Sequence, residues 1–132
     1  FPMSKDRRRT PRGETTVTPD NTAAAMGSGS LPVFATPAMV ALMEEAAVNA
    51  CRGALDEGET TVGTRMEVSH DAASPLGMAV RAEAELTAVE GRKLTFSVRA
   101  YDAAGPIGGG VHQRFVVTAE RFLAKTARRG EV

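Results

Sequence analysis

The sequence of 132 residues predicts a two-layer α+β domain, in which a curved antiparallel sheet wraps around one long apolar helix. Three observations predict this fold class: one helical segment with both ends marked, a run of β-type segments after it, and turn residues between those segments. A chain of this length has room for one domain with one core. We expect residues 14–127 to form that domain, between a flexible N-terminal tail at 1–13 and a C-terminal tail at 128–132.

A short edge strand and a connection precede the helix. Residues 14–18 are rich in β-branched side chains, which favour a strand. Residues 19–35 are rich in Ala, Gly and Ser, and Met26–Leu31 is the part expected to be flexible. This connection is interpreted either as a plain loop or as a lid over a pocket.

The helix is predicted between Thr36 and Gly53. Thr36 is a favourable N-cap, Pro37 suits the first turn, and Gly53 suits the position just beyond the C-terminus. The segment between them is apolar nearly all round, which is typical of a helix buried inside a domain. Glu44 falls on its apolar side, where a carboxylate is costly unless another group pairs with it or uses it. Glu44 is therefore the first candidate functional residue.

The remainder of the chain predicts an antiparallel meander. Its strands are expected at residues 60–69, 77–89, 94–100 and 107–119. Apolar and polar residues alternate cleanly in the second and third strands, and the turn Glu90–Gly91 joins them. Such a sheet leaves an edge strand exposed, and edge-to-edge pairing of two sheets in a homodimer would cover it.

The charge balance excludes several classes of partner. Sixteen basic and sixteen acidic residues cancel, so no overall field attracts nucleic acid or an anionic membrane. The basic runs Arg7–Arg9 and Arg128–Arg129 lie in segments without apolar periodicity, and we expect solvated tails there.

The remaining composition indicates a cytoplasmic protein without a metal or a cofactor. The single cysteine, Cys51, lies on the apolar helix and is expected to be a small buried side chain. No secretory signal and no apolar run of membrane length is present. Two distant histidines and one cysteine lack metal-ligand spacing, and Gly108–Gly110 is not followed by the elements of a phosphate loop.

Several dispersed motifs stand in a fixed order along the chain. They are Val33–Thr36 leading into Leu42–Glu44, Gly63–Thr64, Val68–His70 followed by Ala72–Pro75, Val89–Arg92 and Ile107–Arg114. Together they resemble the motifs of the fluoroacetyl-CoA thioesterase family of hotdog-fold proteins. The resemblance extends from about Glu14 to about Lys125. It implies a hotdog fold and hydrolysis of a small acyl-CoA thioester to the free acid and coenzyme A. It also implies a homodimer with its active sites at the interface.

The resemblance assigns roles to single residues. The catalytic threonine, acid and histidine of the family match Thr36, Glu44 and His70. The glycine that lies against the acyl group matches Gly63, and an arginine lining the site matches Arg114.

One segment departs from the family pattern. The fluoroacetate-specific enzyme carries a phenylalanine in the lid just before its helix, whereas this chain has Leu31 and no phenylalanine before Phe34. Leu31 and Phe34 are therefore the candidate substrate-binding residues of this segment. The resemblance thus implies a short acyl group as substrate, without implying selection for fluorine.

The catalytic candidates also have structural interpretations. Thr36 can be a plain N-cap, although a hydroxyl at a helix N-terminus also lies where an oxyanion would be stabilised. His70 ends a strand, where histidine is often an ordinary polar residue. Together with Glu44, the two residues supply what is needed to activate a nucleophile or a water and to protonate a leaving thiolate.

Arg114 and His112 lie two apart on one strand and share a face. Arg114 can bind an oxygen of the acyl part, pair across a dimer, or belong to an exposed basic stripe. His112 is expected to be structural. Gly63 marks either a β-bulge or a place where a ligand approaches the backbone.

Two other functions compete with the thioesterase. Hotdog hydratases act on enoyl thioesters with an Asp and a His near the helix start, a pair that is absent around Thr36. A non-catalytic acyl-CoA-binding module would use the same groove without turnover. In the thioesterase, His70 is expected to act as general base and acid, and Glu44 to attack the carbonyl or orient a water. Thr36 would position Glu44 or act as a transient nucleophile.

Overall fold

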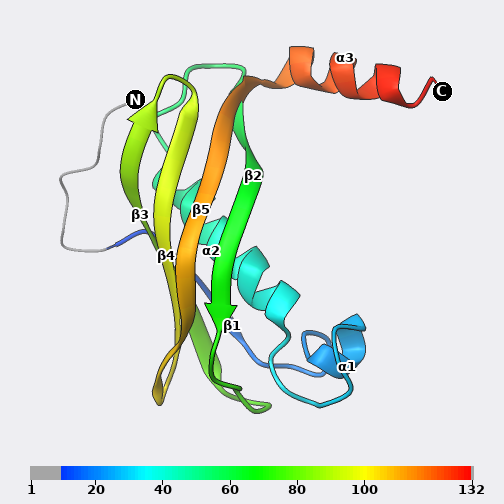
Figure 1. The fold of residues 1–132 in the computed structure, drawn as a ribbon, viewed down its shortest axis with the longest axis vertical. Coiled ribbons are helices and arrows are strands. Elements are labelled where there is room, and N and C mark those ends of the chain that lie inside the picture. The colour runs from blue at the N-terminus through cyan, green and yellow to red at the C-terminus, as the bar shows by residue number, and fades with distance from the viewer. Residues whose placement is uncertain (1–9, 132) are drawn as a thin grey trace.

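The structure, a computed structural model, describes residues 10–131 and confirms the α+β fold. Its elements are β1 (Arg12–Thr16), α1 (Ala23–Met26), α2 (Thr36–Ala50), β2 (Glu59–His70), β3 (Ala79–Glu90), β4 (Lys93–Asp102), β5 (Gly105–Thr118) and α3 (Ala119–Arg129). The strands form one antiparallel sheet in the order β1-β3-β4-β5-β2, which curls around α2 (Figure 1). The basic run Arg7–Arg9 lies outside the described residues.

The core lies between α2 and the inner face of the sheet. Successive strand residues point to opposite faces, so the alternation in β3 and β4 directs one apolar set inward. The sheet supplies Val80, Ala82, Ala84, Leu94, Phe96, Val98 and Ala100, and the helix supplies Met39, Leu42, Met43, Ala46 and Ala47. The predicted apolar faces of these two strands are confirmed.

Helix α2 differs from its prediction at both ends and on one side. Ala35 is the N-cap, and the helix stops at Ala50, before the turn in which Gly53 adopts a φ of 79°. Burial all round is also wrong within one chain, because Ala41 is exposed and Val48 is 40% exposed. The sheet of one chain covers only one side of the helix, and the other side stays open.

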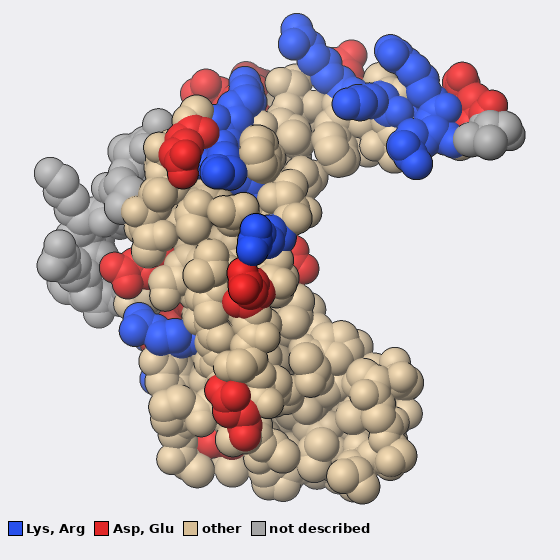
Figure 2. All heavy atoms as spheres, in the orientation of Figure 1, with Lys and Arg blue, Asp and Glu red and all other residues tan. Residues whose placement is uncertain are grey.

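The C-terminal segment forms a helix where the sequence predicted a strand end and a tail. The β-branched run before Ala119 favours a strand, but helix α3 begins at that residue and projects away from the end of β5 (Figure 1). None of its residues is buried; Phe122 and Leu123 are exposed on one side, and basic side chains gather along the helix (Figure 2). The boundaries of the domain at 13/14 and 127/128 stay predictions, although β1 already begins at Arg12.

Two classes of feature are not found in the described part of the chain. None of its helices is long and apolar enough to cross a membrane. No group of three or more His, Cys, Asp or Glu side chains among these residues is placed to hold a metal ion.

Candidate active site

The first residue of α2 and the last residue of β2 meet side by side. Thr36 Oγ1 lies 2.8 Å from His70 Nδ1. The structure has no side-chain cap at the start of α2, so the predicted N-cap role of Thr36 is wrong. Its hydroxyl faces the imidazole instead. A hydroxyl hydrogen-bonded to an imidazole is the pairing that activates a nucleophile in acyl transfer.

Small residues in β5 bring His70 to this position. Gly108 pairs with His70, and a Cβ added at Gly108 would overlap the Ser69 carbonyl and lie 3.1 Å from Met39 Sδ. Only a residue without a side chain lets the strands and α2 approach so closely. Gly108 therefore shapes the backbone around His70, and Gly108–Gly110 lie within a paired strand and form no phosphate loop.

The imidazole of His70 is held in its neutral form. Burial lowers its pKa from the ordinary 6.5, outweighing the raising effects of the Ala72 backbone and the Asp71 carboxylate. Its Nε2 atom is buried and has no hydrogen-bond partner among the described residues. Buried polar atoms are nearly always paired, so Nε2 is a place where a further group is expected to bind.

The lowered pKa predicts the acid limb of the activity profile. If neutral His70 is the base, kcat/KM should fall on the acid side with an apparent pKa below 6.5. Replacing Asp71 by Asn removes a charge that raises this pKa, so the limb should move to lower pH. Initial rates measured from pH 4.5 to 8 test both statements. An apparent pKa above 6.5 for this limb, or a limb that moves to higher pH in Asp71→Asn, would contradict them.

A second cluster surrounds Glu44, farther along α2. Arg114 Nη1 donates to Glu44 Oε2 over 3.0 Å. The guanidinium is also fixed to β2, because Nε donates to Thr61 Oγ1 (2.9 Å) and Nη2 donates to the Thr61 carbonyl (3.1 Å). Arg114 is 6% exposed, so the predicted exposed basic stripe is wrong. The Glu44 side chain is 42% exposed within one chain, not buried as predicted, and the group that pairs with it is Arg114.

Gly63 makes room for the Glu44 carboxylate. A Cβ added there would overlap Glu44 Oε2 and lie 3.2 Å from Arg114 Nη1. The pairing of β2 with β5 also shifts register between Gly63 and Arg65, as in a β-bulge. The β-bulge interpretation of this glycine therefore holds. The group that approaches it within the chain is the Glu44 carboxylate, and approach of a ligand stays a prediction.

Substituting this glycine should damage the site with little effect on folding. In Gly63→Ala, the new methyl group displaces the Glu44 carboxylate, and kcat/KM for the best substrate should fall about tenfold or more. Gly130→Ala, a change in helical backbone at the end of α3, is the matched control. Kinetics and thermal unfolding of both variants provide the measurement. Unchanged kinetics in a folded Gly63→Ala protein would contradict the prediction.

The two clusters lie apart within one chain. Thr36 and Glu44 are eight residues apart on α2, or about 12 Å along the helix axis. Gly63 and His70 are separated by about 20 Å along β2. No side chain spans such distances, so Thr36 cannot position Glu44 of its own chain. One chain therefore holds two separate clusters of candidate residues.

The segment before α2 is ordered by backbone pairing. Phe34 pairs with Thr22 in an isolated bridge, and its amide donates to the Ser74 carbonyl. The Phe34 ring is 1% exposed and belongs to the core, so its predicted contact with substrate is not supported. Leu31 is 63% exposed near the start of α2, and remains the candidate lid residue.

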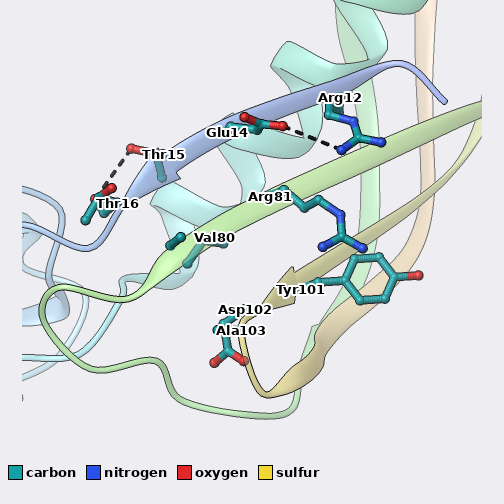
Figure 3. Close-up of a pocket in the computed structure, with 10 residues that line it drawn as sticks. Arg12, Glu14, Thr15, Thr16, Val80, Arg81, Tyr101, Asp102 and Ala103 are labelled. Atoms are coloured by element: carbon teal, nitrogen blue, oxygen red, sulfur yellow. Dashed lines mark hydrogen bonds and ion pairs between the residues drawn. The ribbon is translucent and has the colours of Figure 1, made fainter. Parts of the chain in front are cut away.

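A cavity of about 530 Å³ lies elsewhere, along β1, β3 and the end of β4 (Figure 3). None of the predicted site residues lines it. Both arginines of its wall have partners in the same wall: Arg81 stacks over the Tyr101 ring at 4.5 Å, and Arg12 lies 3.6 Å from Glu14. This cavity is therefore not part of the candidate active site.

Sequence reasoning missed one residue of the second cluster and undervalued another. Thr61 holds Arg114 through both its hydroxyl and its carbonyl. It shares the inner face of β2 with Gly63, and this two-residue spacing was the available signal. His112 lies 3.1 Å from Arg114 Nη1 and is 1% exposed.

Comparisons with known proteins show the family of this chain. Residues 17–120 match the family model of the fluoroacetyl-CoA-specific thioesterase FlK. The chain is 46% identical, over 97 residues, to the fluoroacetyl-CoA thioesterase of Streptantibioticus cattleyicolor, covering 74% of this chain and 70% of that protein.

Solved structures give the same result. A phenylalanine-to-alanine variant of FlK, in complex with fluoroacetate and CoA, has a TM-score of 0.84 at 39% identity and covers 89% of this chain and 97% of its own. A hypothetical protein of Thermus thermophilus, a thioesterase superfamily member, has a TM-score of 0.84 at 31% identity. The match covers 97% of this chain and 96% of that protein. The curled sheet around α2 is thus the hotdog thioesterase fold, and the chain belongs to the fluoroacetyl-CoA-specific thioesterase family.

Proposed function

We propose that this protein hydrolyses the thioester of a small acyl-CoA, giving the free acid and coenzyme A. The observation that carries the proposal is the hydrogen bond between Thr36 and His70 in a chain of this thioesterase family. Similar proteins are described in complex with fluoroacetate and CoA and with acetyl-CoA, which supports a substrate of two to a few carbons. No cofactor is needed, because water is the only other reactant.

We further propose that the active site is completed by a second copy of the chain. β2 is an edge strand of the sheet, and an antiparallel pairing with its own copy would extend the sheet. If this pairing is centred between Met66 and Glu67, His70 of one protomer lies opposite the partner's Gly63. The two half sites then come together twice per dimer.

The open side of α2 supports the same arrangement. Val48, Ala41 and the half-exposed Glu44 carboxylate share that side, and Figure 2 shows a hollow between α3 and the α1 end of the molecule. A second copy that pairs along β2 would cover apolar surface that one chain leaves in water. The dimer therefore accounts for both the exposed helix side and the divided site.

The mechanism follows from the two half sites. His70 removes a proton from the Thr36 hydroxyl or from a water held by the partner's Glu44, and the oxygen attacks the thioester carbonyl. The free N–H groups at the start of α2 favour the developing oxyanion. Protonated His70 then delivers its proton to the departing thiolate of coenzyme A. If a water attacked, the free acid is formed in this step; if Thr36 attacked, His70 next activates a water that hydrolyses the threonine ester, which releases the acid and restores the Thr36 hydroxyl. We assign this reaction to the cytoplasm, as the sequence predicts.

Thiol release from a panel of acyl-CoA substrates tests the proposed function. The panel runs from acetyl to medium chain and includes fluoroacetyl and a dicarboxylic acyl group, with His70→Ala measured in parallel. Short acyl groups should be hydrolysed, and the variant should lose turnover. The dicarboxylic substrate should be poor, because Arg114 already donates to groups of its own chain.

The same panel separates the proposal from its rival. Binding of acyl-CoA without thiol release across all substrates would favour the non-catalytic module. Thiol release that persists in His70→Ala would refute the assigned catalytic role of His70.

A further inference from the structure

His112 is a buried histidine to which the proposed reaction gives no role. It lies on β5 opposite Phe96 of β4, is 1% exposed, and has its ring centroid 6.3 Å from that of Phe96. Both ring nitrogens are engaged: Nδ1 lies 2.7 Å from the Arg65 carbonyl, and Nε2 lies 3.1 Å from Arg114 Nη1. A histidine with two fixed partners has a defined orientation and a defined tautomer.

The partners of His112 determine where its proton lies. A carbonyl can only accept, so Nδ1 carries the hydrogen. A guanidinium can only donate, so Nε2 presents its lone pair to Arg114. Burial, assisted by the Arg114 charge, lowers the pKa of His112 against the raising effects of the Arg65 carbonyl and Glu44. His112 is therefore neutral, and its 4.0 Å separation from Glu44 Oε2 is no ion pair.

The contacts of His112 and Arg114 form a continuous chain from β2 to the Glu44 carboxylate. The Arg65 carbonyl, beside the β-bulge, fixes His112, and His112 accepts one hydrogen of Arg114 Nη1. The other hydrogen of Nη1 is directed to Glu44 Oε2 over 3.0 Å. With Thr61 holding Nε and Nη2, every nitrogen of the guanidinium is fixed by a group of the same chain.

We propose that His112 is a positioning residue, which together with Thr61 sets the rotation of Arg114 and through it the place of the Glu44 carboxylate. The inference rests on the proposed function, because it assumes that Glu44 acts on the thioester. It assigns to Arg114 the orientation of Glu44 instead of direct binding of the acyl group. Loss of the His112 acceptor should therefore lower kcat and leave KM nearly unchanged.

Two amide substitutions separate the two contacts of His112. In His112→Gln, the amide reaches the place of Nε2 and can still accept from Arg114. In His112→Asn, the shorter amide reaches only the place of Nδ1 and the Arg65 carbonyl. Both side chains are buried polar amides, so they should cost similar stability. Val111→Ala, the neighbouring residue on the outer face of β5, is the control for an ordinary change in this strand.

The two variants are expected to differ in kcat. His112→Asn should lower kcat about tenfold or more with KM changed less than about threefold, whereas His112→Gln should recover most of kcat. Equal kcat values in the two folded variants, a loss confined to KM, or full activity in His112→Asn would overturn the proposal.

A structural readout separates this inference from the proposed function. A crystal structure of His112→Asn should show Glu44 displaced from Gly63, whether or not the protein hydrolyses acyl-CoA. If unaltered protein releases no thiol from any substrate, the proposed function fails, and Glu44 in its original place in His112→Asn would independently refute the positioning role.

Discussion

Replacing His70 by alanine is expected to lower kcat by a factor of about 10² to 10⁴. The imidazole is the group that faces the Thr36 hydroxyl at 2.8 Å, and its neutral form is favoured by burial. Without it, neither the attacking oxygen nor the leaving thiolate has a proton-transfer partner. Because His70 acts on the reacting atoms, kcat should fall far more than KM rises. Thiol release under saturating substrate provides the measurement.

The control must separate lost chemistry from lost structure. Ser69→Ala changes the neighbouring residue, whose side chain is exposed, and should retain nearly full activity. Added imidazole should restore part of the activity of His70→Ala, because the small molecule can enter the space that the side chain leaves. A folded His70→Ala protein with ordinary kcat would show that another group transfers the proton.

Replacing Glu44 by glutamine is expected to lower kcat by about 10² to 10³, with little change in stability. The amide oxygen of glutamine can still accept from Arg114 Nη1, so the arginine keeps a partner. What disappears is the negative charge that attacks the carbonyl or orients a water. The rate of the chemical step should therefore fall, whereas the stability of the folded protein should change little.

Glu45→Gln offers a matched control on the next residue of α2. Glu45 is exposed, and its carboxylate lies beside Gly13 of β1 and not beside Gly63, so its substitution should leave kcat unchanged. Thermal unfolding should give similar midpoints for both variants. Full thioesterase activity in a normally folded Glu44→Gln protein would end the assignment of Glu44 to catalysis.

The regular part of the fold could be predicted because its signals are local. Alternation along β3 and β4 assigned the inner faces correctly, since the pleat fixes the direction of each side chain. The end of β5 could not be predicted in the same way: a β-branched run leads directly into α3, which buries none of its residues. The helix is amphipathic, with Phe122 and Leu123 among charged residues, but it is short and follows the β-branched run without a break.

The candidate site was predicted in its members but not in its arrangement. The family motifs gave Thr36, Glu44, His70, Gly63 and Arg114, and the structure places all five in two clusters. Strand register and the rotation of α2 decide which of these residues meet. No local pattern encodes either, so the pairing of Thr36 with His70, and of Glu44 with Arg114, could not be predicted.

Burial was the least predictable property of the site. The sequence predicted a helix buried on all sides, but one sheet covers only half of it, and the Glu44 carboxylate remains 42% exposed. In the dimer that we propose, a second copy covers the other half of the helix, and a single sequence does not indicate which surface a copy covers.

The most direct test of the central claim, a site shared between two copies, combines the two inactive variants in one dimer. His70→Ala and Glu44→Gln chains with different affinity tags are produced together, and the mixed dimer is isolated through both tags. One site of that dimer then has an intact His70 and an intact Glu44, and the other site lacks both. The account predicts about half the thiol-release activity of the unaltered dimer. A mixed dimer as inactive as either variant alone would contradict it.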